Sequence, residues 1–131
     1  MAENSIGINI WDDYYDDGYV PNGEIQETYA YVESSKMKGK DEDCKNILDS
    51  FKKTLEELAK PEWALEFDLH YHDSTKIYPN LVGTEHEWCL YKRWQLGIKH
   101  LTHEAREYFV EALKNKQLEY NGMQIDVYSE S

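Results

Sequence analysis

The sequence has few of the features that mark specialised classes of protein. Only two of its 131 residues are cysteine, too few for a disulfide-stapled scaffold in a chain that can build its own core. No apolar run approaches the roughly 20 residues that a membrane-spanning helix needs. Phosphate-binding loops, dinucleotide fingerprints, serine elbows and zinc-binding cysteine pairs are also missing. We therefore expect a non-enzymatic protein that carries no cofactor.

Positive charge is also scarce. The chain has 14 Lys and Arg against 26 Asp and Glu, a formal net charge of −12. Nucleic-acid affinity comes largely from Lys and Arg displacing counterions, so we expect no direct nucleic-acid binding. Binding to an anionic membrane surface is disfavoured for the same reason. Residues 1–35 hold eight of the acids and no Lys or Arg, so the excess charge belongs mainly to one segment.

What is present fits a globular domain. Apolar residues make up 40% and aromatic residues 14% of the chain, and a chain of 131 residues fits a single domain over 1–131. The first residues contain no basic stretch followed by an apolar one, so we expect no signal peptide. The expected compartment is the cytoplasm, which would be that of the host if the protein is phage-encoded.

The spacing of apolar residues predicts the secondary structure. Alternation with a period of two favours strands, whereas apolar residues at i, i+3, i+4 and i+7 favour a helix. The helix over 41–60 begins with three acids and ends before Pro61, and Thr102 is the expected N-cap of a second helix. Strands are predicted over 6–11, 25–32, 63–72, 88–98 and 123–127, and helices over 41–60 and 102–117.

This order, ββαββαβ, predicts an α+β fold. We expect an antiparallel sheet of about five strands with two helices packed on one face, which leaves the other face to solvent or to a partner. The two halves also resemble each other, since Pro21-Asn22 recurs 58 residues later as Pro79-Asn80 and Phe51 as Phe109. A ββα duplication is one interpretation of this spacing, and chance identity is the other.

The candidate binding surface is the acidic, aromatic segment near the amino end. Trp and Tyr carry much of the binding energy at protein interfaces, and charge complementarity governs partner choice. A hairpin that presents both would meet a basic partner. The predicted partner-binding residues are Trp11, Asp12, Asp13, Tyr15, Asp16, Asp17, Tyr19 and Glu24. The same segment matches a calcium loop only in part, because Tyr15 stands where a calcium ligand is required.

Two other functions remain open at this stage. The strand over 63–72 places Glu66, Asp68, His70 and His72 on one face, which could hold a metal for binding or hydrolysis. Alternating polar residues are equally typical of a solvated sheet face. The chain could also be a structural subunit that forms a homo-oligomer through an open sheet face.

The charge and composition favour a binding protein over these alternatives. We expect an acidic protein, monomeric or homodimeric, that docks on a basic partner such as a nuclease or another nucleic-acid-binding protein. Its carboxylates could occupy a groove meant for phosphates and so mimic a nucleic acid. Immunity proteins and phage inhibitors of restriction or CRISPR (anti-CRISPR) systems share this size and acidity, although no residue motif ties the chain to them.

Overall fold

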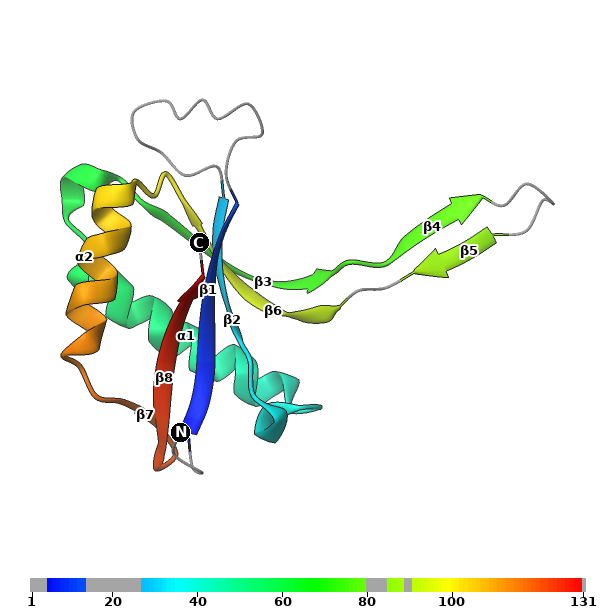
Figure 1. Cartoon of the computed structure of the whole chain (residues 1–131), viewed down its shortest axis with the longest axis horizontal. Helices are drawn as coiled ribbons and strands as arrows, with labels where there is room; N and C mark the ends of the chain where they lie inside the picture. Colours follow the sequence, from blue (N-terminus) through cyan, green and yellow to red (C-terminus); the bar gives the residue numbers. More distant parts are fainter. Residues whose placement is uncertain (1–4, 14–26, 80–84, 89–90, 131) are drawn as a thin grey trace.

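The chain folds around a six-stranded mixed sheet with two helices, an α+β arrangement (Figure 1). The structure is a computed structural model that describes residues 5–13, 27–79, 85–88 and 91–130. Within them the sheet has the strand order β3-β6-β2-β1-β8-β7. Its strands are β1 (Ser5–Asp13), β2 (Glu27–Val32), β3 (Glu66–Asp73), β6 (Lys92–Lys99), β7 (Leu118–Tyr120) and β8 (Met123–Glu130).

The expectation of a five-stranded antiparallel sheet is wrong in two respects. β1 pairs in parallel with β8, so the sheet is mixed. A further strand, β7, pairs with the beginning of β8 and is only three residues long. So short a strand has no detectable period of two, and the parallel pair joins the two ends of the chain. Neither feature leaves a local signal in the sequence.

The chain forms a separate two-stranded ribbon in the segment that connects β3 to β6. β4 (Lys76–Pro79) and β5 (Glu85–Trp88) form an antiparallel pair that projects away from the main sheet (Figure 1). The sequence predicted a turn region here and placed Trp88 at the start of the fourth strand, whereas that strand, β6, begins at Lys92.

Both predicted helices are confirmed. α1 (Asp41–Leu58) has three acids in its first turn, where they stabilise the helix dipole. α2 (His103–Lys114) has Thr102 as its N-cap, and the Thr102 side chain accepts a hydrogen bond from the Ala105 amide at 3.2 Å. Of the helices in the described part of the chain, none has the length and apolarity needed to cross a bilayer.

The core lies between the sheet and the helices. One cluster of buried residues combines inward side chains of the strands with one stripe of each helix, so both helices cover the same face of the sheet. Its strand members include Ile6, Ile8, Ile10, Ala30, Leu96 and Ile98, and its helix members include Ile47, Leu48, Phe51, Leu55, Ala105, Phe109 and Leu113.

The facing of β6, ambiguous in the sequence, is decided by this core. Leu96 and Ile98 are buried in it and Trp94 packs against it, so Arg93, Gln95 and Gly97 point to the opposite face. Each helix follows an antiparallel pair of strands, β1–β2 before α1 and β3–β6 before α2. The ββα duplication itself stays a prediction.

Candidate functional site

The sheet face opposite the helices is the candidate site. Because side chains alternate along a strand, the neighbours of the core isoleucines point to this face. The strand register pairs Trp11 with Tyr29, Asn9 with Tyr31, and Asn9 with Tyr128, so three neighbouring strands bring aromatic rings together. We call this surface the uncovered face, because neither α1 nor α2 packs on it. Its principal residues are Gly7, Asn9, Trp11, Tyr29, Tyr31, Tyr91, Arg93, Gln95, Gly97 and Tyr128.

Trp11 and Tyr128 are the large rings that this face leaves in water. Trp11 is 41% exposed and Tyr128 is 46% exposed. The Trp11 indole packs edge-on against Tyr29, with ring centroids 5.4 Å apart and an interplanar angle of 81°. This contact restrains the indole while much of its surface stays accessible. A partner that covered it would gain apolar burial and lose little side-chain entropy.

Arg93 is held between two tyrosine rings. Its guanidinium carbon lies 3.5 Å from the centroid of the Tyr31 ring and 3.9 Å from that of Tyr91. Arg93 Nε also donates a hydrogen bond to Gln95 Oε1 at 3.0 Å, and the His72 ring packs on Tyr91 with centroids 5.2 Å apart. Cation–π attraction and the hydrogen bond together fix the orientation of Arg93. The stack therefore makes this part of the face preorganised.

A buried amide lies beneath the aromatic rings. Asn9 is only 2% exposed, and its Nδ2 donates hydrogen bonds to the Tyr31 hydroxyl at 2.7 Å and to Glu33 Oε2 at 3.1 Å. Buried polar groups are stable in a fold when they are hydrogen-bonded. The first bond fixes the Tyr31 hydroxyl and so supports one side of the Arg93 stack, and the second joins Asn9 to Glu33.

The charge of the uncovered face is negative among its described residues. Its bases are Arg93 and Lys99, and its carboxylates are Glu33, Glu66, Asp68, Glu119 and Asp126. Since Arg93 is already held by two rings, the charges accessible to a partner are mostly carboxylates. Aromatic rings with carboxylates around them match a surface of opposite charge.

The histidines of β3 lie on this face beside a depression of about 330 Å³ that Gln95 and Gly97 help to line. His70 Nδ1 lies 3.1 Å from Asp68 Oδ2, and the His70 and His72 rings are 6.3 Å apart. A structural or catalytic metal site usually needs three protein ligands or more. Among the side chains that the structure describes, no group of three or more His, Cys, Asp or Glu is placed to hold a metal ion.

The structure describes only part of the predicted binding segment. Trp11 lies at the end of β1 as an exposed ring, and Asp12 and Asp13 are the last residues of that strand, their side chains not described. The other predicted residues lie outside the described part of the chain: Tyr15, Asp16, Asp17, Tyr19 and Glu24. The prediction for these residues therefore stays a prediction.

Sequence reasoning missed several residues of this face. Tyr29 and Tyr31 alternate with Thr28 and Ala30 inside a predicted strand, so the period of two could have assigned them to one face. Tyr128 lies just beyond the predicted last strand, and no local pattern in the sequence places it beside Asn9. That neighbourhood depends on the parallel pairing of the two terminal strands.

Comparisons with known proteins add no identification: no protein-family model, curated protein or solved structure matches this chain.

Proposed function

We propose that this chain is a non-enzymatic acidic binding protein that docks on a basic, nucleic-acid-handling partner protein. It would act in the manner of an immunity protein or a phage anti-defence inhibitor. The observation that carries the proposal is the exposed Trp11, braced by Tyr29 at the end of β1, where the acidic run of the sequence begins. An aromatic anchor beside carboxylates suits a surface rich in Lys and Arg.

The preorganised rings support this function. Association is opposed by the entropy of ordering side chains, and rings that are already packed lose less of it. Trp11 against Tyr29, and Arg93 between Tyr31 and Tyr91, are held before any partner arrives.

The charge supports the choice of partner. A net charge of −12 attracts a cationic protein over a distance and raises the rate of encounter. Nucleases and other nucleic-acid-binding proteins carry basic grooves for phosphates, and carboxylates can occupy such grooves. Attraction of this kind weakens as salt rises, because mobile ions screen exposed charges.

The test compares two aromatic residues of equal exposure on opposite sides of the molecule. Trp11 lies on the uncovered face and Tyr108 on α2, and both are 41% exposed. A partner captured at low salt is identified, purified and titrated against Trp11→Ala and Tyr108→Ala by calorimetry. We expect Trp11→Ala to weaken binding about 30-fold or more, as a central aromatic anchor does, and Tyr108→Ala to leave it nearly unchanged. Equal affinities for the two variants would contradict the proposal.

A second variant tests the acidic segment. Reversing the charge of Asp12, Asp13, Asp16 and Asp17 together should abolish binding and leave the melting temperature nearly unchanged, because the sequence predicts a solvated hairpin here and exposed charges contribute little to stability. Unchanged affinity in this variant would end the electrostatic part of the proposal.

Two cheap measurements address the other functions. Elemental analysis of protein purified without chelator, compared with the His70→Ala, His72→Ala variant, tests the metal alternative, since that variant should lose any metal bound there. Light scattering over a range of concentrations tests the homo-oligomer, because self-association rises with concentration. Stoichiometric metal in the first measurement, or a stable oligomer in the second, would favour the corresponding alternative.

A further inference from the structure

In the part of the chain that the structure describes, one edge of β8 has a neighbouring strand along only part of its length. β8 pairs with β1 over seven residues, from Ser5 with Gln124 to Trp11 with Glu130. On its other side, β7 pairs only with Met123–Ile125. Beyond Ile125, this edge has no strand beside it in the part of the chain that the structure describes. An open edge is a template for another strand, and proteins usually cover or block it.

The strand register identifies the backbone groups of β8 that face no described strand. β7 and β8 are joined by the two-residue turn Asn121–Gly122, whose φ angles of 49° and 80° are those of a type I′ hairpin turn. In such a hairpin the closing pair, Tyr120 and Met123, exchanges both backbone hydrogen bonds. Along β8, the backbone N–H and C=O groups of every second residue are directed to the same edge of the strand. Those of Val127 and Ser129 are therefore directed to the edge that has no described strand beside it.

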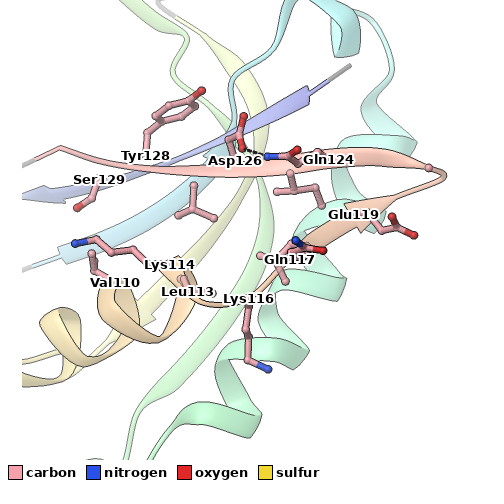
Figure 2. A pocket seen from close by; sticks show the side chains of 14 residues that line it. Val110, Leu113, Lys114, Lys116, Gln117, Glu119, Gln124, Asp126, Tyr128 and Ser129 are labelled. Atoms are coloured by element: carbon pink, nitrogen blue, oxygen red, sulfur yellow. Dashed lines mark hydrogen bonds between the residues drawn. The ribbon is translucent and has the colours of Figure 1, made fainter. Parts of the chain in front are cut away.

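A groove of about 890 Å³ lies beside this edge (Figure 2). Its apolar lining comes from α2, β7 and β8, and Lys114 and Lys116 also line it; the apolar residues are Val110, Leu113, Leu118, Ile125 and Val127. Asp126 and Tyr128 point to the other side of β8, the side of the uncovered face (Figure 2). The open edge therefore has a groove with apolar and basic side chains on one side and an acidic, aromatic surface on the other.

We infer that the free edge of β8 binds an extended segment of the basic partner, which joins the sheet as an additional strand. This inference rests on the proposed function and names the contact by which the partner would be held. Backbone hydrogen bonds to Val127 and Ser129 supply the pairing. Side chains alternate along the added strand, so those facing Val110 are apolar and those facing Asp126 are Lys or Arg.

Charge favours such a segment over a second copy of the chain. Pairing between two β8 edges would bring two strands that each carry Asp126 into one sheet, within molecules that each have a net charge of −12. Like charges on neighbouring strands destabilise the pair, whereas Lys or Arg near Asp126 stabilises it. On the side of the uncovered face, Asp126 therefore favours a basic strand over a second copy of β8.

The probe is a capped octapeptide of alternating Val and Lys, titrated against the full chain by fluorescence anisotropy. A block peptide with four Lys followed by four Val has the same charge and composition but cannot place its side chains alternately. A peptide of alternating Val and Glu keeps the alternation and reverses the charge. We expect the Val-Lys peptide to bind about tenfold or more tightly than either control and to slow amide hydrogen exchange at Val127 and Ser129. Equal binding of the alternating and block Lys peptides would overturn the inference.

Two substitutions at Ser129 separate the backbone from the side chain. Arg106 donates a hydrogen bond to the Ser129 hydroxyl, and both Ser129→Ala and Ser129→Pro remove it. Only Ser129→Pro also removes the N–H directed to the edge of β8 without a described strand, and a sheet tolerates proline on such an edge. We expect Ser129→Pro to weaken Val-Lys binding about tenfold relative to Ser129→Ala, as loss of a strand-pairing donor should. Equal affinities for the two variants would overturn the inference.

If Ser129→Pro does not fold, Asp126→Lys takes its place. This variant should bind the Val-Lys peptide more weakly and the Val-Glu peptide more tightly, and no change in either affinity would overturn the inference.

Concentration-dependent dimerisation that protects Val127 from exchange would also overturn the inference, in favour of a second copy. A partner lost with Trp11→Ala but retained with Ser129→Pro refutes strand addition and leaves the proposed function intact. A peptide that pairs with β8 when no basic protein partner exists refutes the proposed function alone.

Discussion

Two glycines of the uncovered face give the sharpest test of how closely that face is packed. Gly7 of β1 and Gly97 of β6 both lie in strands, and neither has a positive φ. A Cβ added at Gly7 would lie 2.7 Å from the Glu33 carbonyl oxygen and 3.1 Å from the Tyr128 ring. A Cβ added at Gly97 would come no closer than 3.6 Å, to the Asp68 carbonyl oxygen. The same substitution should therefore have opposite effects at the two positions.

The magnitude follows from which atoms must move. At Gly7 the nearer obstacle is backbone, and the Glu33 amide donates a 2.8 Å hydrogen bond to the Gly7 carbonyl. Relieving the clash therefore strains a hydrogen bond that holds the segment after β2 in place. Overpacking costs about 1–3 kcal/mol, offset by about 0.5–1 kcal/mol because alanine loses less backbone entropy than glycine. We expect Gly7→Ala to lower the free energy of unfolding by about 1–2 kcal/mol and the melting temperature by about 4–8 °C.

Gly97→Ala serves as the matched control. Its new methyl group makes only ordinary van der Waals contacts, so the entropic gain of about 0.5 kcal/mol should leave the melting temperature equal or slightly raised. Urea unfolding gives the free energy and calorimetry the midpoint. Tyr128→Ala should not rescue Gly7→Ala, because the closer contact is with the Glu33 carbonyl. If Gly7→Ala were as stable as Gly97→Ala, the packing described for the uncovered face would be wrong.

Three smaller predictions concern single contacts. Thr102→Ala removes the hydrogen bond that the Ala105 amide donates to the cap and should lower stability by about 1 kcal/mol, measured by urea unfolding with Thr102→Ser as control. The side chain and the backbone amide of Thr75 hold the pKa of Asp73 below its ordinary value, and the amide donates to Asp73 Oδ1 at 2.8 Å. The contribution of Asp73 to stability is therefore present above its unfolded pKa and lost as pH falls through its folded pKa. An NMR titration should find that Thr75→Pro, which removes both donors, raises this pKa, and an unchanged value would refute the assignment. Burial and the neighbouring acids raise the pKa of the Cys44 thiol, so in the folded protein it should be alkylated more slowly than a free cysteine at the same pH, with the urea-unfolded chain as reference; equal rates would contradict its burial.

Much of the local structure could be predicted from the sequence. The amphipathic period over 41–60 and the cap at Thr102 led to α1 and α2, which begin and end close to the predicted bounds. The alternation over 6–11 also predicted the strand β1, whose isoleucines the structure places in the core. These predictions succeed because helix periodicity, capping and strand alternation depend on neighbours within a few residues.

The candidate site was harder to predict because its residues meet only across strands. Trp11 was predicted as a partner-binding residue, and this role stays a prediction. The structure shows that its ring is exposed and packs against Tyr29. Asn9 alternates with the isoleucines and would be expected in water, yet it is buried beneath Tyr31. The position of Arg93 between two rings could not be predicted either, since the facing of its strand was ambiguous.

By itself, the sequence determined the secondary structure of most segments, the acidity of the chain and the apolar positions that form the core. Tertiary structure alone decided that β1 lies beside β8, that β7 pairs with β8 only up to Ile125, and that the Asn9 side chain is buried. The physical reason is the range of the interactions. Propensity, capping and periodicity act between residues close in the chain, whereas strand pairing depends on which distant segments lose least entropy and bury most surface when they meet.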